Sequence, residues 1–226
     1  IGMMRSFQMV VFAIIHLPLS ARIGVKTNCQ QTGFYGRFKP PLRRLKPLDG
    51  GVTEMSEIII DRDEARRDLA AIFRWTAREN MHEGVANHFS YAISDDGQRF
   101  LMNPFGKHFS KMRASDLIEI DAAQYPAELR GRIDPTAWAI HSAMHRNNPQ
   151  ARCIVHLHTH YATALSALKS PALPAIDQTS CRFHNRVAVD VGFGGMGLGD
   201  EAERLSTLLG NKMMMINGIR KLNIVK

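Results

Sequence analysis

Apolar side chains recur at helical spacing in four segments of this 226-residue chain. The predicted helices cover residues 61–80, 135–145, 161–168 and 200–209. In the first of them, Leu69, Phe73 and Thr76 share one helix face, as expected for an amphipathic helix packed on a core. Asp61 stands where a carboxylate caps a helix, and Pro135 is well suited to a first helical turn.

Shorter apolar or alternating runs predict strands between these helices. The predicted strands cover residues 88–93, 99–102, 117–120, 152–156, 186–191 and 212–216. The first two are joined by Asp95-Asp96-Gly97, a sequence typical of a hairpin turn. Hairpin strands followed by alternating strands and helices predict an α/β fold in which helices flank a sheet.

The amino-terminal segment has a different character. Residues 26–54 are rich in Gly, Pro, Lys and Arg and lack periodicity, so residues 1–54 are predicted to form a poorly structured basic extension. The folded domain is predicted to cover residues 55–226. An apolar run at residues 9–19 is too short to span a bilayer. Because Arg5 precedes it, a cleaved signal peptide is the alternative interpretation.

Charge and cysteine content narrow the functional classes. The net charge is +8, but residues 1–54 hold eight Lys or Arg and only two acidic residues, so the remaining chain is nearly neutral. This distribution gives no reason to expect a nucleic-acid partner for the folded part. Cys29, Cys153 and Cys181 are odd in number and widely spaced, which favours a reducing, cytoplasmic compartment over a disulfide framework.

The most informative local motif is His156-Leu157-His158, at the end of an apolar run. Side chains alternate along a strand, so the two imidazoles are expected to point to the same face. Two imidazoles converging at a strand end can bind one divalent metal ion. Two unrelated histidines at the end of a strand remain the alternative.

Four sequence blocks, in this order, resemble the class II aldolase and adducin family over residues 58–216. They are Gly84-Val85-Ala86-Asn87-His88-Phe89-Ser90, Met102-Asn103-Pro104-Phe105-Gly106, Asp134-Pro135-Thr136-Ala137-Trp138 with His141, and His156-Leu157-His158-Thr159-His160 with Tyr161–Leu165. The resemblance implies a three-layer αβα fold with a mainly antiparallel central sheet. It also implies a homo-oligomer, since family enzymes are often tetramers.

The resemblance implies a function and roles for particular residues. Family enzymes cleave or epimerise small phosphorylated sugars, and a divalent metal, usually zinc, stabilises an enediolate. His156 and His158 match the first two metal ligands of the family. Asn87, Gly106 and Thr136 match positions that bind the substrate and its phosphate.

The chain also departs from the family pattern. The family's catalytic Glu is replaced by Ala137, whose methyl group carries no proton. This makes the chain similar to a divergent, adducin-like branch and leaves the catalytic residue unknown. The third metal histidine is expected after the strand at 212–216, where Asn217-Gly218 stands instead. The domain is therefore expected to be truncated and incomplete at its carboxyl end, although a naturally short family member is the alternative.

Other histidines offer weaker candidates. His160 would reach the metal only if the strand continued past His158. His141 and His145 lie four apart on one helix face, where a solvated or packing role is favoured over metal binding. His88 has no spacing argument behind it.

Two functions from different classes follow. The first is a metal-dependent aldolase-like enzyme, a carbon–carbon lyase or sugar-phosphate epimerase acting on a small-molecule substrate. The second is a non-catalytic binding module that associates with a cytoskeletal protein such as actin, as adducins do. No membrane span is expected in either case.

Overall fold

A single sheet forms the centre of the protein in a computed structural model that describes residues 11–15, 61–125, 127–192 and 197–217. Its strand order is β4-β3-β2-β5-β1-β7-β6. The strands are β1 Val11–Ile15, β2 His88–Ala92, β3 Arg99–Met102, β4 Ile118–Asp121, β5 Cys153–Leu157, β6 Val187–Asp190 and β7 Met214–Asn217. All neighbouring pairs are antiparallel except β6 and β7, which are parallel.

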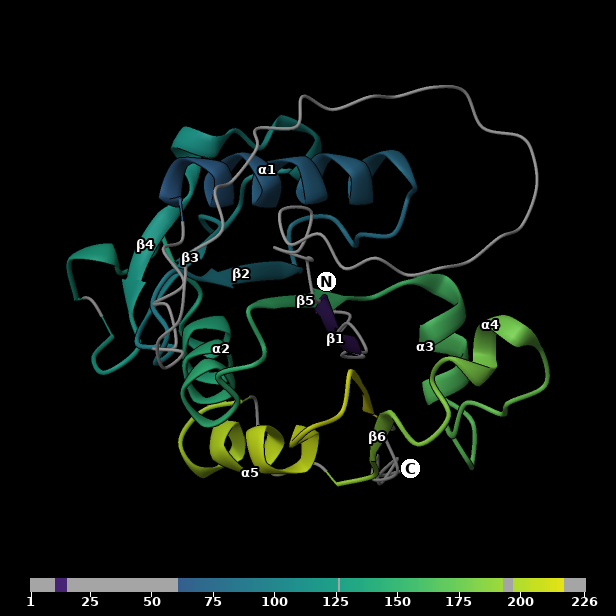
Figure 1. Cartoon of the computed structure of the whole chain (residues 1–226). Coiled ribbons are helices and arrows are strands. Elements are labelled where there is room, and N and C mark those ends of the chain that lie inside the picture. Colours follow the sequence, from purple (N-terminus) through teal and green to yellow (C-terminus); the bar gives the residue numbers. More distant parts are fainter. Residues whose placement is uncertain (1–10, 16–60, 126, 193–196, 218–226) are drawn as a thin grey trace, which may run out of the picture. The chain divides into compact units, whose positions relative to one another are not determined.

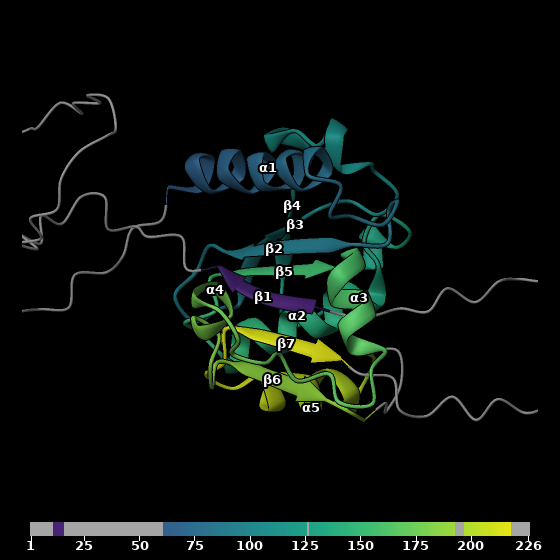
Figure 2. The same ribbon diagram turned by 90° about the vertical axis from the view of Figure 1, so that its right-hand side faces the viewer.

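Helices cover both faces of this sheet (Figures 1 and 2). They are α1 Arg62–Arg78, α2 Pro135–Asn147, α3 His160–Ser166, α4 Gln178–Cys181 and α5 Asp200–Leu209. α1 lies on one face, and α2 and α5 lie on the other. The predicted α/β fold, with three layers and a mainly antiparallel sheet, is therefore confirmed.

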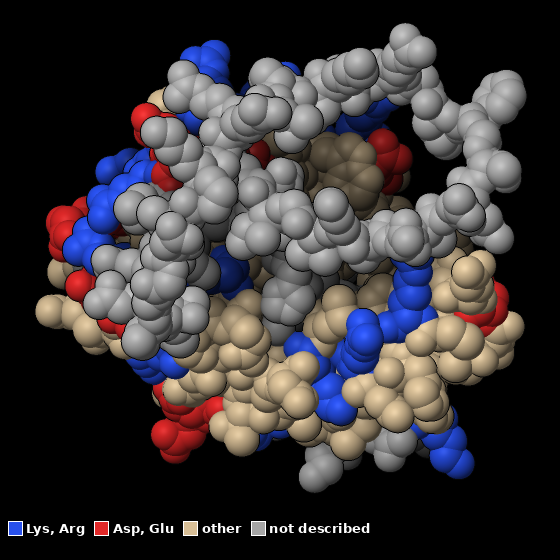
Figure 3. Space-filling model, in the orientation of Figure 1, with Lys and Arg blue, Asp and Glu red and all other residues tan. Residues whose placement is uncertain are grey.

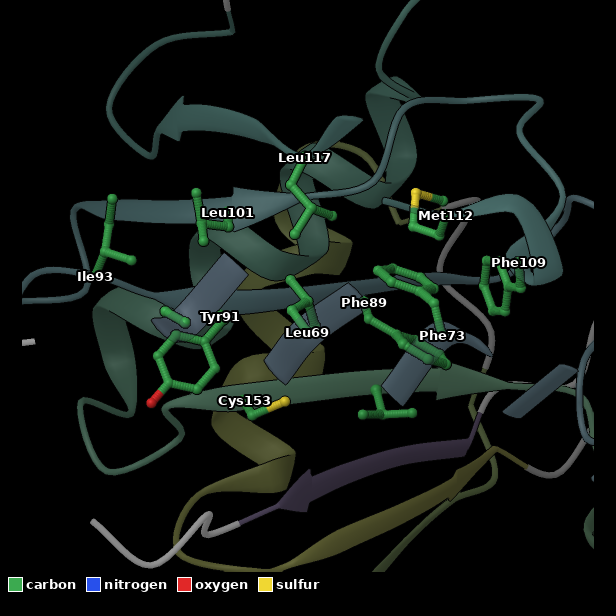
Figure 4. Close-up of a cluster of buried hydrophobic side chains, with 12 residues drawn as sticks. Leu69, Phe73, Phe89, Tyr91, Ile93, Leu101, Phe109, Met112, Leu117 and Cys153 are labelled. Atoms are coloured by element: carbon green, nitrogen blue, oxygen red, sulfur yellow. The ribbon is translucent and has the colours of Figure 1, made fainter. Parts of the chain in front are cut away.

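α1 forms where the periodicity predicts it. The Asp61 carboxylate accepts hydrogen bonds from the backbone N–H groups of Asp63 and Glu64, so the helix begins there. Phe73 stacks on Phe89 of β2 with ring centroids 4.4 Å apart. These rings belong to an apolar cluster between α1 and the sheet (Figure 4), whose other members include Leu69, Tyr91, Leu101, Phe109, Met112 and Cys153.

A second apolar cluster joins α2 and α5 to the opposite face of the sheet. Met144 of α2, Leu205 of α5 and Ile154 of β5 are buried in it. Side chains alternate along β5, so Ile154 and His156 face α2 whereas Cys153 and Val155 face α1. The register of β5 therefore decides on which face of the sheet His156 lies.

The structure differs from the sequence prediction at β1. Val11–Ile15 is a strand between β5 and β7, so the prediction of a poorly structured segment is wrong for these five residues. A strand in the middle of a sheet reads as a continuous apolar run rather than an alternating one, and Val-Phe-Ala-Ile-Ile is such a run. The rest of residues 1–54 lies outside the described residues, as does Cys29.

The described surface carries both signs of charge. Figure 3 shows blue and red side chains side by side over β4 and the start of α1. There Arg62 and Arg99 both reach the carboxylate of Glu119. Within the described residues, no helix has the length and apolar character that crossing a bilayer requires.

Substitution of Gly97, in the predicted hairpin turn, tests how tightly the β2–β3 turn packs against α2. Its φ is +71°, and a Cβ atom there would lie 2.2 Å from the backbone oxygen of His145. We expect Gly97→Ala to lower the free energy of unfolding by about 2–4 kcal/mol, from backbone strain and overpacking together. Urea denaturation measures this change.

Gly131→Ala is the matched control. Gly131 has a φ of +80°, but a Cβ atom there would meet nothing within 4 Å. We expect this variant to lose only the backbone contribution, about 1 kcal/mol. Equal losses in the two variants would show that the contact between Gly97 and α2 is not tight.

Candidate functional site

Two imidazoles converge where β5 ends. His156 lies within β5 and His158 is the first residue after it, and both side chains are buried. Their Nε2 atoms are 2.9 Å apart. The two imidazoles therefore lie on the same face, as the His-x-His spacing predicts, and their Nε2 atoms are in direct contact.

The separation of this pair is close to the one that a metal site requires. Zinc–nitrogen bonds of about 2.0–2.1 Å in tetrahedral geometry place two ligand nitrogens roughly 3.3 Å apart. A widening of a few tenths of an ångström would bring His156 and His158 to that spacing. Within the described residues, no third His, Cys, Asp or Glu completes a metal-binding group with them.

Glu83 orients one of the two imidazoles. Its carboxylate accepts a hydrogen bond from Nδ1 of His158. This bond places the proton of His158 on Nδ1 and leaves a lone pair on Nε2, the atom that faces His156. A carboxylate behind a histidine is the usual support of a metal-binding imidazole.

Asn87 belongs to the same corner of the structure. Its Oδ1 accepts a hydrogen bond of 2.7 Å from the backbone N–H of Glu83. This contact fixes the orientation of the amide, so Nδ2 is the group left facing the interior. In the part of the chain that the structure describes, buried Nδ2 has no hydrogen-bond acceptor. The site therefore contains a desolvated N–H donor that a ligand oxygen could satisfy.

His88 lies directly beside the pair on the neighbouring strand. It is the cross-strand partner of His156, and the two rings stack with centroids 4.2 Å apart and planes 5° from parallel. Burial lowers the pKa of His88 to about 4, and the nearby Asp134 carboxylate opposes that shift. His88 is therefore neutral at physiological pH.

A line of hydrogen bonds runs from His88 into the core between β2 and α2. His88 Nδ1 contacts His141 Nε2 at 2.8 Å, and His141 Nδ1 contacts the Ser90 hydroxyl. The same hydroxyl contacts His145 Nε2 at 2.7 Å. His145 Nδ1 then contacts the backbone oxygen of Ala151 at 2.9 Å.

The last contact sets the direction of every hydrogen bond in the line. The carbonyl of Ala151 can only accept, so His145 donates from Nδ1 and accepts at Nε2 from Ser90. Ser90 then accepts from His141, which in turn accepts from Nδ1 of His88. All three imidazoles are thereby assigned as neutral Nδ1–H tautomers.

The pKa values agree with neutral imidazoles. Burial lowers the pKa of His145 to about 3. It also holds the pKa of His141 and of His156 well below the ordinary value, with neighbouring histidines adding to the effect. An unprotonated imidazole is the form that binds a metal ion.

Of the predicted substrate residues, Gly106 lies in the turn that follows β3 and Thr136 lies in α2. Gly106 has a φ of +79°, and open space surrounds the position of a Cβ atom, so the backbone there is accessible. The backbone N–H of Phe105 bonds the carbonyl of Arg132, which ties the Gly106 turn to the segment leading into α2. Thr136 is in the first turn of α2 and donates its hydroxyl to Asp134.

Ala137 faces away from polar groups. Its methyl group is buried in an apolar cluster with Phe100, Met102 and Ile120. Neither a proton donor nor an acceptor is present at this position. The side chain of Ala137 therefore takes no part in proton transfer.

Comparison with known proteins assigns the chain to a family. A family model described as the Class II Aldolase and Adducin N-terminal domain matches residues 67–218. The chain therefore belongs to the class II aldolase and adducin family. The L-fuculose 1-phosphate aldolase of Glaciozyma antarctica has a similar structure, with a TM-score of 0.59 and 29% sequence identity over 74% of this chain and 65% of that one.

The similar curated proteins include both aldolase-like and adducin-related members of the family. A putative aldolase class 2 protein of Caulobacter vibrioides is 30% identical over 155 residues, which cover 68% of this chain and 60% of the relative. Adducin-related protein 1 of Caenorhabditis elegans is 32% identical over 112 residues, which cover 48% of this chain and 15% of the relative. The chain spans less than two thirds of the length of either relative.

Sequence reasoning missed part of this arrangement. Glu83 and Ser90 were not predicted as site residues, and His88 was named only as a weaker candidate. His141 and His145 carry a usable signal in their i, i+4 spacing. Both of these helix residues are fully buried, so the solvated alternative is wrong and the packing alternative is confirmed. His160 begins α3 and is exposed, because the strand ends before it.

Acidification tests the buried imidazoles. In the unfolded chain His88 and His145 bind protons near pH 6.5, but in the folded chain only near pH 4 and 3. Below pH 6.5 the unfolded state therefore binds more protons, and stability falls as the pH falls. We expect a loss of about 2 kcal/mol for each group between pH 7.5 and 5. Urea denaturation at pH 7.5 and 5 measures it.

His145→Asn supplies the comparison. Asparagine keeps a donor for the Ala151 carbonyl but does not titrate, so this variant should be less stable at pH 7.5 and show a shallower dependence on pH. A parent protein whose stability is flat over this range would contradict the assignment of neutral buried imidazoles.

Proposed function

We propose that this domain binds one divalent metal ion, zinc, through His156 and His158 and acts as an aldolase-like enzyme on a small sugar or sugar phosphate. The observation that carries the proposal is the convergence of the two Nε2 atoms at 2.9 Å, with the Glu83 carboxylate behind His158. Two unrelated strand-end histidines would not require a carboxylate to select the tautomer of one of them.

The surrounding residues have complementary roles in this proposal. A bound divalent ion would supply stabilisation for the negative charge that develops on a substrate oxygen. Glu83 holds the His158 ring in place. The buried Nδ2 of Asn87 donates a hydrogen bond to an oxygen of the substrate. The open backbone at Gly106 contacts its phosphate. The hydroxyl of Thr136, which donates to Asp134 in the structure, turns to donate to the phosphate when the substrate binds.

The relatives support the substrate class. The structurally similar protein from Glaciozyma antarctica is an L-fuculose 1-phosphate aldolase, and a sugar phosphate suits a site that combines two imidazoles with neutral donors. Ordinary aldol cleavage also requires a group that moves a proton, and Ala137 does not provide one. Either another residue of the site transfers the proton, or the domain catalyses a different reaction at the carbonyl group of the sugar substrate.

A binding module without catalysis is the second candidate. The apolar surroundings of Ala137 favour it, because a scaffold has no use for a proton carrier. The similarity to Adducin-related protein 1 supports it as well. In that case the partner is a cytoskeletal protein of the actin type, and the buried histidines are part of the core.

Metal content tests the first candidate. We expect about one zinc ion per chain in the purified 226-residue protein and none in the His156→Ala, His158→Ala double variant. Elemental analysis after gel filtration measures this ratio. His160→Ala with His184→Ala is the matched control, because both of these side chains are exposed, and it should keep the metal.

The two candidates predict different results in parallel assays. Stoichiometric metal together with carbonyl-product release from phosphorylated sugars supports the enzyme. Absence of metal from the parent, together with sedimentation of the chain with filamentous actin, supports the binding module. Equal zinc in the parent and the double variant would contradict the assignment of His156 and His158.

Glu83→Gln tests the support of the metal pair separately. A neutral amide holds the imidazole more weakly than a carboxylate, so we expect metal affinity to fall about 10–100-fold while the stoichiometry stays near one. Competition with a chromophoric chelator measures the affinity. Unchanged affinity would show that Glu83 contacts His158 without tuning it.

A further inference from the structure

A cavity lies on the other side of the sheet, between α1 and the segment that follows β3. Its volume is about 510 Å³, within the usual range for small-molecule sites. The lining residues are Arg74, Lys107, Ser110, Lys111, Met112 and Arg113. Four of these six are cationic, and none is acidic.

Among the described residues, acidic side chains balance only part of this charge. Lys107 pairs with Asp116 at 2.6 Å, and the same carboxylate interacts electrostatically with Arg113. Within the described residues, Arg74, Lys111 and Arg113 form no ion pair with a carboxylate. Three like charges around one cavity repel each other, and a bound anion would relieve that repulsion.

The cationic side chains extend from rigid backbone. Arg74 follows Phe73 in α1, and Phe73 packs edge-to-face on Phe109 with centroids 4.5 Å apart. Phe109 opens the short 3₁₀ helix Phe109–Lys111, and Met112 beneath it is fully buried. The apolar core therefore fixes the backbone positions from which Arg74 and Lys111 extend.

We propose that this cavity binds a small anion that carries two or more phosphate groups. A single phosphate group carries about −1.5 to −2 charges at neutral pH, which leaves three cations only partly compensated. Two or more linked phosphates match them. Two guanidinium groups present paired donors to phosphate oxygens, and the Ser110 hydroxyl adds another donor.

This site is distinct from the one proposed for the sugar substrate. Asn87, Gly106 and Thr136 do not line the cavity, although Gly106 directly precedes Lys107, which does. Arg74 and Lys111 have no part in the proposed metal and sugar-phosphate site, so substituting them tests this cavity separately. The phosphates can belong to a soluble polyphosphate or to the headgroup of a phosphorylated lipid, since both present the same chemistry.

Titration calorimetry of the full chain with inorganic pyrophosphate and tripolyphosphate tests the proposal. We expect binding of both, weaker binding of orthophosphate, and a decrease as salt rises. Arg74→Gln with Lys111→Gln should weaken pyrophosphate binding roughly tenfold or more, because two charge-assisted contacts are lost. Both side chains are exposed, so the fold should be retained.

Arg67→Gln with Arg182→Gln is the matched control, since it removes the same charge from exposed residues that do not line the cavity. It should bind pyrophosphate like the parent. Sedimentation with vesicles containing a bisphosphorylated inositol lipid identifies the lipid as the source if binding depends on Arg74 and Lys111. Absence of binding to all these probes, equal losses in the two double variants, or equal affinity for orthophosphate would overturn the proposal.

Discussion

The backbone carbonyl of Ala151 imposes one direction on the polar interior of this protein. It can only accept a hydrogen bond, so His145, Ser90, His141 and His88 must each donate toward it in turn. Burying this many polar rings is tolerable only when each has a partner, because an unsatisfied buried group costs about 1–3 kcal/mol. The line of bonds therefore fixes how α2 packs against β2.

The candidate metal pair depends on the same packing. β2 pairs with β5 in a register that sets His88 beside His156, and His88 is held from behind by His141. A slip of one residue in this register would move His156 to the face covered by α1. Glu83 holds the ring of His158 by a hydrogen bond. Each of the two adjacent imidazoles is therefore positioned by a different residue, His156 by His88 and His158 by Glu83.

Ala137 illustrates why the fold of this chain does not establish a catalytic activity. The chain has the family fold and two converging imidazoles, whereas the side chain of Ala137 is buried in an apolar cluster. A fold does not specify a reaction, and the relatives of this chain include both aldolases and adducins. The proton carrier, if there is one, has to come from other residues of the site.

Local patterns were sufficient for most of the elements. The periodicity of Leu69, Phe73 and Thr76 predicted α1, and the Asp95-Asp96-Gly97 turn predicted the β2–β3 hairpin. β1 was not predicted, since a short apolar run next to a basic segment has the same pattern whether it enters a sheet or not. Its place between β5 and β7 is set by pairing with residues at least 138 positions away in the chain, since Ile15 pairs with Cys153.

By itself, the sequence determined that His156 and His158 share one face, because strand geometry alternates side chains regardless of what surrounds them. It also determined the family blocks, which are local motifs. Only the tertiary structure decided that Glu83, 75 residues away, supports His158 and that His88 stacks on His156. These contacts join distant segments through strand register and helix packing, and no local pattern encodes which distant partners will meet.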